Sequence, residues 1–394
     1  MNADQIIQAE SKYLVPTYVR PPTVFARGKG AYLFDTEGNA YLDLTAGIAV
    51  TALGHSDDEW ARVVAEQART LVHVSNLYHT APHVELAQRL IENSFADRLF
   101  FCNSGGEANE TALKFARKWA KSGGQPNKTA ILAFEGGFHG RSMGALSVTA
   151  KSRYRQPFAP LVPGIAFAPF NDLEAARAAM SPKTCAVIVE PVQGEGGVHP
   201  ADPLFLAGLR QLCDEQNALL IFDEVQCGLG RTGHLWAHQA FGVEPDIMTL
   251  AKPLAGGLPI GATLVTESVA QVMEPGDHGS TFAAGPLVCK AGQVVFDRVN
   301  QPGFLADVRE KGAYLLEKLR ALPTDKLVAA RGAGLLIGVE FTESVKPLIA
   351  AAAGRGLLII NAGDKVLRLC PSLTISRGEI NAAVQIITEC LADF

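Results

Sequence analysis

The segment AVIVEPVQGEGGVHPADPLFLAGLRQLCDEQNALLIF, residues 186–222, decides the fold. It begins and ends with short apolar runs, AVIVE (186–190) and LLIF (219–222), of the kind that forms strands buried on both faces of a parallel sheet. Between them, apolar residues follow the i, i+4, i+7, i+8 spacing of an amphipathic helix: Phe205, Leu209, Leu212 and Cys213. This strand–helix–strand pattern predicts two parallel strands joined by a right-handed crossover.

Three further apolar runs extend the same pattern: LFFC (99–102), AILAF (130–134) and IMTLA (247–251). Together the five runs predict an α/β fold with a mostly parallel central sheet that is flanked by helices. The large domain is expected to span residues 54–286.

The two ends of the chain have a different character. Residues 31–44 contain two strand-like runs around a turn, which predicts a hairpin. After residue 287, a helix, the runs LLIGVEF, GLLII and VLRLC, and a last helix over 377–391 predict a smaller α+β domain. Residues 1–53 are expected to contribute to that small domain, whose main part is 287–394.

Composition narrows the class of protein. The chain has 394 residues, of which 48% are hydrophobic and 19% charged, enough for a sizeable core. The net charge of −5 argues against nucleic acid or an anionic membrane as a partner, and no run of 18 apolar residues predicts a transmembrane helix. The seven cysteines form no C-x-x-C pair, and the polar start MNADQIIQAESKY lacks a signal-peptide pattern. We therefore expect reduced thiols and a cytoplasmic protein.

Polar and glycine-rich loops follow each of the five predicted strands. If the strands are parallel, these loops meet at one edge of the sheet, where ligands of open α/β sheets bind. The sequence therefore predicts a site built from the following segments: 103–107, 135–141, 191–197, 223–226 and Lys252.

Ser104, Gly105 and Gly106 precede a helix whose free N–H groups suit a phosphate. The same residues also fit a capping box, Ser104-x-x-Glu107, which is the more frequent explanation of such a pattern taken alone.

Lys252 and Asp223 can each be explained by a role in cofactor binding or by a simpler structural role. Lys252 ends a strand, where burial would lower the pKa of its amine and favour Schiff-base formation, but it could also extend into solvent. Asp223 could pair with a pyridinium nitrogen or form a salt bridge or helix cap. A phosphate cradle, a strand-end aspartate and a strand-end lysine together are the groups that bind pyridoxal phosphate.

The stretch Gly228-x-Gly230-x-x-Gly233 matches the dinucleotide fingerprint and supports a competing hypothesis, an NAD(P)-dependent oxidoreductase. In a dinucleotide turn, however, the first glycine directly follows the strand, and here Asp223 holds that place. We expect these glycines to permit tight turns beside the site. A non-catalytic interaction protein is disfavoured by the convergence of five loops.

Five ordered motifs resemble the class III, or ω-amino-acid, pyridoxal phosphate aminotransferases: SGGEANE (104–110), FHGRSMGALSVT (138–149), EPVQGEGG (190–197), DEVQCGLGRTG (223–233) and TLAKPLAGGLPIGA (249–262). The resemblance extends from about residue 15 to the C-terminus. Within the family, the sequence is most similar to the acetylornithine aminotransferases. The family implies the pyridoxal phosphate-dependent fold type I and a homodimer with active sites at the subunit interface.

The resemblance also implies roles for individual residues. Lys252 would bind the cofactor and shuttle the proton, and Asp223 would pair with the ring nitrogen. Gln226 would contact the ring hydroxyl, and Phe138 would stack on the ring face. The phosphate would be bound by Ser104, Gly105 and Gly106, and by Thr281 of the neighbouring subunit.

The resemblance implies that two arginines and one glutamate bind and distinguish the two substrates. Arg141 would grip the far carboxylate of the amine substrate, and Arg368 the α-carboxylate of glutamate, because a guanidinium binds a carboxylate with two parallel hydrogen bonds. Glu195 would neutralise Arg368 when the ω-amine binds. The simpler alternative for both arginines is a surface ion pair.

The function implied is transfer of the δ-amino group of N2-acetylornithine to 2-oxoglutarate by a ping-pong mechanism, in arginine biosynthesis. Ornithine, succinylornithine, 4-aminobutyrate and carrier-linked lysine remain alternative substrates. Residues 75–78 are expected near the acyl group, and Ala283–Leu287 depart from the family pattern. No metal is expected. The sequence has one cluster of histidines at 73, 79 and 83, and a pair, His234 and His238, that could share a helical face, but neither group has an added ligand beside it.

Overall fold

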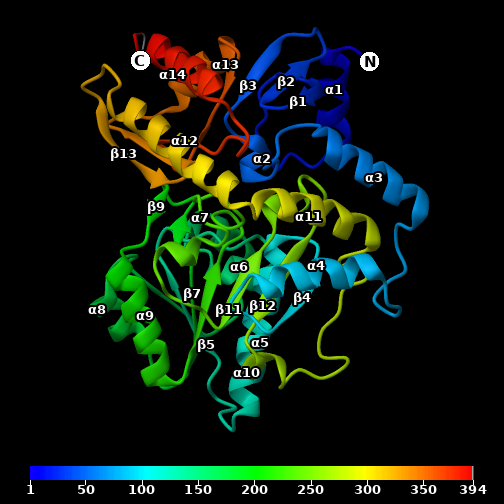
Figure 1. Cartoon of the computed structure of the whole chain (residues 1–394). Coiled ribbons are helices and arrows are strands. Elements are labelled where there is room, and N and C mark those ends of the chain that lie inside the picture. The colour runs from blue at the N-terminus through cyan, green and yellow to red at the C-terminus, as the bar shows by residue number, and fades with distance from the viewer. Residues whose placement is uncertain (393) are drawn as a thin grey trace.

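The predicted parallel sheet forms the centre of the lower lobe of the molecule (Figure 1). The computed structural model describes residues 1–392 and 394. The seven strands lie in the order β4 (Arg98–Cys102), β12 (Gly261–Val265), β11 (Ile247–Leu250), β10 (Leu219–Asp223), β7 (Thr184–Val189), β5 (Ala130–Phe134) and β6 (Ile165–Ala168). The five predicted strands are all present and mutually parallel.

Two strands of this sheet, β6 and β12, were not predicted. β12 is antiparallel to both of its neighbours, β11 and β4. Residues 251–260 connect β11 to β12 through the 3-10 turn η3 (Lys252–Ala255), and Gly256 and Gly257 have positive φ angles of 62° and 126°. Such a short connection reverses the chain, because a parallel crossover needs a dozen or more residues.

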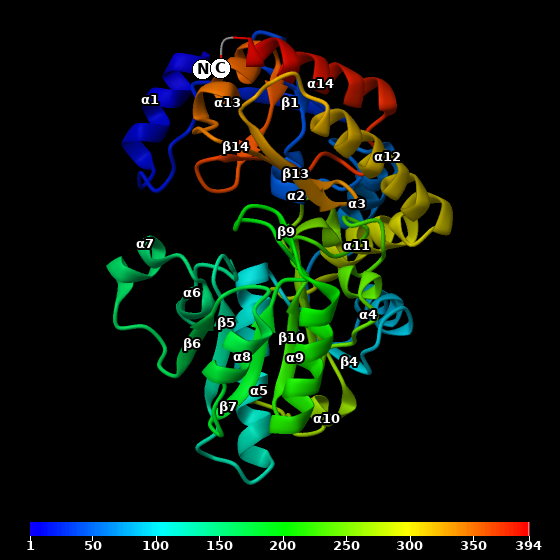
Figure 2. The same ribbon diagram turned by 90° about the vertical axis from the view of Figure 1, so that its left-hand side faces the viewer.

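Helices cover both faces of this sheet (Figure 2). On one side lie α8 (Leu173–Ala179) and α9 (Pro203–Gln216), and on the other lies α5 (Gly105–Ser122). The side chains of β10 alternate between the two faces: Leu220 and Phe222 pack with α9, whereas Leu219 and Ile221 belong to the core against α5. Burial on both faces explains why this strand is continuously apolar.

The upper lobe combines residues from the two ends of the chain (Figure 1). One sheet has the order β1 (Phe25–Lys29), β2 (Tyr32–Asp35), β3 (Ala40–Asp43) and β15 (Leu357–Leu358), and the other has the order β13 (Leu327–Ala333), β14 (Leu336–Phe341), β17 (Val366–Leu369) and β16 (Ile360–Asn361). The predicted hairpin is the antiparallel pair β2 and β3. The run GLLII was predicted as one strand, but it divides into β15 and β16, which join different sheets.

The upper lobe also contains several helices: α1 (Ala3–Tyr13), α12 (Pro302–Arg320), α13 (Lys346–Gly354) and α14 (Arg377–Leu391). The last of these has the predicted bounds, and its first turn is closed by a reciprocal capping box between Ser376 and Glu379.

Three helices lie where the lobes meet: α3 (Asp58–Thr70), α4 (Ala81–Glu92) and α11 (Pro286–Val299). The remaining elements are short: α2 (Ala46–Ala49), α6 (Met143–Val148), α7 (Ser152–Arg155), η1 (Gln156–Phe158), β8 (Val192–Gln193), β9 (His199–Pro200), η2 (Ala237–Ala240) and α10 (Glu267–Ala270). Among the described residues, no helix combines the length and apolar character needed to cross a membrane.

Candidate active site

A cavity of about 220 Å³ opens at the carboxyl ends of the parallel strands. Four of the five predicted segments contribute lining residues, including Gly105, Phe138, Asp223 and Lys252. Glu190, the last residue of the run 186–190, also lines the cavity, whereas the predicted segment 191–197 does not. The sheet therefore brings together polar groups that lie up to about 150 positions apart in the sequence.

Lys252 begins η3, separated from the end of β11 by one residue, and is half-buried. Desolvation lowers the pKa of its amine, and the positive charge of Arg368 lowers it further, whereas Asp223 and Glu195 act in the opposite direction. A larger fraction of the amine is therefore neutral than in an exposed lysine, and the neutral amine is the nucleophilic form.

Asp223 ends β10 and is only 3% exposed. Its Oδ2 accepts hydrogen bonds from Asn109 Nδ2 at 2.8 Å and from the His139 ring at 2.7 Å. Its Oδ1 accepts from the backbone N–H of Val225 at 2.9 Å. Thr249 donates to Asn109 Oδ1 at 2.9 Å and so fixes the orientation of that amide. Three donors stabilise the carboxylate of Asp223 and hold it at the cavity.

Sequence reasoning missed Asn109 and His139, although both lie in quoted motifs. Asn109 occupies the buried face of α5, between Ala108 and Ala112. A polar residue on an apolar helical face requires a partner, and this was the available signal. His139 had no comparable signal, because its ring reaches Asp223 only through the tertiary fold.

Ser104 is the N-cap of α5, and its Oγ accepts from the N–H of Glu107 at 3.2 Å. The predicted box is not reciprocal, because the Glu107 carboxylate accepts from the N–H of Asn103 at 2.8 Å. Gly105 and Gly106 come before the first intrahelical hydrogen bond of α5, so their N–H groups have no partner within the helix. A Cβ at Gly105 would lie 2.6 Å from Val225 Cγ1, so only glycine fits there without a shift.

The residues of this cavity fit pyridoxal phosphate. Lys252 offers an amine, Asp223 a carboxylate, and the start of α5 offers N–H groups for a phosphate. The Oε2 atom of Glu190 is buried and has no hydrogen-bond partner among the described residues. An orphaned buried polar atom beside these groups indicates that a polar ligand completes the site.

Arg368 projects from β17 of the upper lobe and is 2% exposed. Its guanidinium lies 2.8 Å from Glu195 Oε1, and it donates to Gln226 Oε1 at 3.1 Å. Its Nε has no partner within the described part of the chain. The arginine is therefore neutralised by a partly exposed glutamate next to the cavity residue Gln226.

Arg141 lies beside a second cavity of about 240 Å³, whose lining includes Phe138, Tyr154 and Glu195. The guanidinium carbon of Arg141 is 3.6 Å from the centre of the Tyr154 ring and 5.6 Å from that of Phe138. Arg141 is exposed and stacks on these aromatic faces instead of pairing with an acid. The surface ion pair considered as its alternative is therefore absent from the described structure.

Thr281 is exposed and does not line the cavity of its own chain. Its neighbour Ser280 accepts a hydrogen bond from Asn103 Nδ2 at 2.9 Å, and the carbonyl of Ser280 accepts from Asn76 at 3.0 Å. The segment around Thr281 thus lies between residues 75–78 and the loop before α5. The departing residues Ala283 and Ala284 are buried.

The glycine-rich stretch after β10 does not form a dinucleotide site. Residues 228–233 are buried and open no helix. Gly230 and Gly233 have positive φ angles of 84° and 83°, and a Cβ at Gly230 would lie 2.5 Å from Val299. The glycines therefore permit tight, closely packed turns, as expected. The oxidoreductase hypothesis is wrong, because no helix N-terminus is available there for a pyrophosphate.

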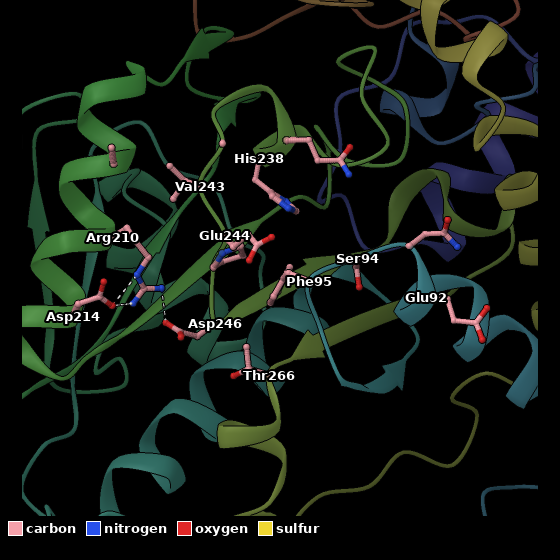
Figure 3. A pocket seen from close by; sticks show the side chains of 15 residues that line it. Glu92, Ser94, Phe95, Arg210, Asp214, His238, Val243, Glu244, Asp246 and Thr266 are labelled. Atoms are coloured by element: carbon pink, nitrogen blue, oxygen red, sulfur yellow. Dashed lines mark hydrogen bonds and ion pairs between the residues drawn. The ribbon is translucent and has the colours of Figure 1, made fainter.

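A larger cavity, of about 990 Å³, lies at the opposite edge of the sheet (Figure 3). Its lining includes Asp246, just before β11, and Thr266, just after the antiparallel β12. Arg210 lies between two carboxylates, at 2.7 Å from Asp214 and 2.8 Å from Asp246.

His238 also borders this larger cavity, and its Nδ1 lies 2.9 Å from Glu224. His234 and His238 do not share a helical face, because η2 begins only at Ala237.

Comparison with known proteins agrees with the geometry of the smaller cavity. The family model described as "Aminotransferase class-III" matches residues 14–391. The mitochondrial acetylornithine aminotransferase of Alnus glutinosa is 52% identical over 394 residues, which cover 98% of this chain and 87% of that protein.

Two solved structures are similar over the whole chain. The N-acetylornithine aminotransferase of Stenotrophomonas maltophilia K279a has a TM-score of 0.85 and 37% identity, covering 98% of this chain and 99% of that one. The ornithine aminotransferase of Toxoplasma gondii ME49 has a TM-score of 0.96 and 30% identity, covering 100% and 96%. The chain therefore belongs to the class III aminotransferases and is a pyridoxal phosphate-dependent enzyme.

Proposed function

We propose that the enzyme transfers the δ-amino group of N2-acetylornithine to 2-oxoglutarate, giving N-acetylglutamate 5-semialdehyde and glutamate, in arginine biosynthesis. The proposal rests on the ion pair between Arg368 and Glu195, whose charged atoms are 2.8 Å apart. This pair lies beside the smaller cavity, which contains Lys252. A ping-pong transaminase of this kind must accept an ω-amine and an α-amino acid in one site. An arginine whose charge can be covered or released suits both.

The names of similar proteins support this choice of substrate. Acetylornithine aminotransferases from Alnus glutinosa and from Caldanaerobacter subterraneus are 52% and 45% identical to this chain over nearly its whole length. The ornithine aminotransferase of Toxoplasma gondii has the same fold at 30% identity, so the fold alone does not select the substrate.

When bound, pyridoxal phosphate supplies an electron-withdrawing ring that stabilises negative charge on the carbon next to the substrate nitrogen. Lys252 Nζ, neutral more often because of its lowered pKa, would hold the cofactor and would accept and return the proton of that carbon. Asp223, fixed by Asn109 and His139, would pair with the ring nitrogen and keep it protonated. Phe138 would stack on the ring, and Gln226 would contact its hydroxyl.

Phosphate binding falls to Ser104, Gly105 and Gly106 at the start of α5. The backbone N–H groups of the two glycines would donate hydrogen bonds to the phosphate, and the dipole of α5 would favour its negative charge.

For the substrate, Arg141 binds the far carboxylate of acetylornithine, and the exposed guanidinium beside the second cavity has room for it. Arg368 binds the α-carboxylate of glutamate after Glu195 moves away. Because Glu195 is partly exposed, its displacement transfers the carboxylate to water at little cost in solvation.

A homodimer completes the proposed site. Large apolar side chains near Thr281 are unusually exposed: Leu77 by 84%, Tyr78 by 72% and Phe282 by 70%. Exposed apolar groups in one region mark an interaction surface, and a second copy would cover them. Thr281, which does not line the cavity of its own chain, would then reach the partner's phosphate site. We also propose a cytoplasmic location, which suits a chain whose seven cysteines are all buried.

The deciding experiment is a half-reaction panel. Purified enzyme receives one amino donor at a time, and the change in the visible absorption of the cofactor is followed. We expect rapid conversion with N2-acetylornithine and with glutamate, and slower conversion with ornithine, 4-aminobutyrate and lysine derivatives. Faster conversion with any of the latter three than with N2-acetylornithine would replace the proposed substrate.

A further inference from the structure

Two buried glutamates near the ends of neighbouring strands have opposite surroundings. Glu190, directly after β7, is 5% exposed, and Glu224, directly after β10, is 1% exposed. Glu224 accepts hydrogen bonds from the N–H groups of Ala237 at 2.6 Å and His238 at 2.8 Å, and from the His238 ring at 2.9 Å. A carboxylate is well stabilised by three donors, so Glu224 is a structural anion.

Glu190 has no such shell of donors. The backbone N–H of Phe138 is the hydrogen-bond donor that stabilises its carboxyl group. Its Oε2 atom is buried without a hydrogen-bond partner in the described chain, and the residue lines the smaller cavity. Leaving a buried polar atom unpaired is costly, so native structures rarely do so unless a ligand supplies the partner.

The charged groups around Glu190 decide its protonation. Burial and the negative charge of Asp223, from β10, raise the pKa of Glu190 well above its ordinary value, and Glu195 adds to this. Lys252, from η3, acts in the opposite direction. Asp223 has three hydrogen-bond donors of its own. When two carboxyl groups share a dry site, the one with fewer donors keeps the proton.

We propose that Glu190 is a cofactor-binding residue that faces the cavity as a neutral carboxylic acid and donates a hydrogen bond from Oε2 to an oxygen of bound pyridoxal phosphate. The proposal rests on the cofactor lying in this cavity. An acid is the form that fits, because pyridoxal phosphate presents negatively charged oxygens that a second carboxylate beside Asp223 would repel.

Three variants test the proposal through the affinity of the apo-protein for pyridoxal phosphate, which needs no turnover. Glu190→Gln keeps the size and a donor, so its Kd should stay within about threefold of the wild type. Glu190→Ala removes the donor, and its Kd should rise about tenfold. An unchanged Kd in Glu190→Ala, or an equal loss in both variants, would overturn the proposal.

Glu224→Gln is the matched control for burial. Its new NH₂ group would face three N–H donors, so the apo-protein should lose about 5 °C in Tm, whereas Glu190→Gln should lose none. A loss of similar size in Glu190→Gln would show that Glu190 is also a structural anion, which contradicts the proposal.

The pH dependence supplies a readout that does not depend on the alanine variant folding. A raised folded-state pKa gives stability that is complete below the unfolded-state value, about 4.3, and is lost as the pH rises to the folded-state pKa. Glu190→Gln lacks this loss, so its Tm advantage over the wild type should grow as the pH rises above about 4.3. In infrared spectra at neutral pH, the carbonyl band of a protonated carboxyl should disappear in Glu190→Gln and persist in Glu224→Gln. A constant Tm difference and an unchanged infrared spectrum would refute a neutral Glu190.

Discussion

The two cavities at opposite edges of the seven-stranded sheet show that size is a poor guide to chemistry. The cavity at the amino edge is about 990 Å³, whereas the one at the carboxyl edge is about 220 Å³. In the large cavity, Arg210 is matched by Asp214 and Asp246 within the chain itself. In the small one, Glu190 Oε2 lacks a partner among the residues that the structure describes, and the pKa of Lys252 is lowered. Groups left incomplete by the fold distinguish the reactive cavity from the inert one.

The largest effect that this contrast predicts is for Lys252→Ala. In the proposed mechanism, loss of the amine removes both the cofactor attachment and the proton carrier, so turnover should fall by at least about 10³-fold. Steady-state kinetics measure the loss, and circular dichroism shows whether the fold is intact. Full turnover in the variant would mean that the small cavity is not the reactive one.

Asp223→Ala should mainly weaken the binding of the cofactor. In the proposed arrangement it removes the carboxylate partner of the ring nitrogen, and it leaves Asn109 and His139 without their acceptor. A hydrogen bond to a charged group is worth about 1.5–3 kcal/mol, so the Kd for pyridoxal phosphate should rise roughly tenfold to a hundredfold. Titration of the apo-protein, followed by cofactor absorption, measures it. An unchanged Kd would mean that the cofactor ring does not bind next to Asp223.

Glu195→Ala should change the balance between the two half-reactions. With Arg368 permanently uncovered, the preference should move about tenfold from the ω-amine toward glutamate. Single-turnover rates with each amino donor give the ratio. If the ratio matches that of the wild type, the pair between Arg368 and Glu195 has no role in switching substrates.

Arg141→Ala should raise the KM for N2-acetylornithine by about tenfold, because one bidentate carboxylate contact is lost. The Kd for the cofactor should change by less than about threefold, since the guanidinium stacks on Tyr154 outside the small cavity. Comparing the two constants in the same preparation separates substrate binding from a general disturbance. Equal substrate kinetics would remove Arg141 from the site.

The smallest effect should come from the large cavity. Arg210→Ala breaks the contacts with the exposed Asp214 and the partly exposed Asp246, and should lower Tm by about 2 °C. Its kcat/KM should remain within about twofold of the wild type. A loss of activity comparable to that of Arg141→Ala would mean that the large cavity communicates with the reaction.

The central fold could be predicted because the buried strands carry a local signal. The runs at 186–190 and 219–222 are apolar on both faces, and the helix between them has a regular apolar spacing. Strand β12 was missed because its direction depends on the short turn from η3. The division of GLLII between two sheets was equally invisible, since it reflects where the chain crosses between neighbouring sheets.

The site was predictable to the extent that its residues follow strands. Lys252 and Asp223 each come directly after or at the end of an apolar run, so their common edge follows from the topology. His139 and Glu190 act through contacts that form only in three dimensions, with Asp223 as the shared neighbour. A residue whose significance lies in what surrounds it gives little signal in a linear sequence.

The pairing of β3 with β15 has a consequence for synthesis of the chain. Leu42 donates to the carbonyl of Gly356 at 2.8 Å, and Leu44 to that of Leu358 at 2.9 Å, so one edge of the N-terminal sheet is closed by residues made much later. During translation, the backbone N–H and C=O groups on this edge of β3 stay unpaired until residues 356–358 are made, and they can pair with other nascent chains. Ribosome-stalled fragments that end before residue 356 should therefore depend on chaperones more than the released chain.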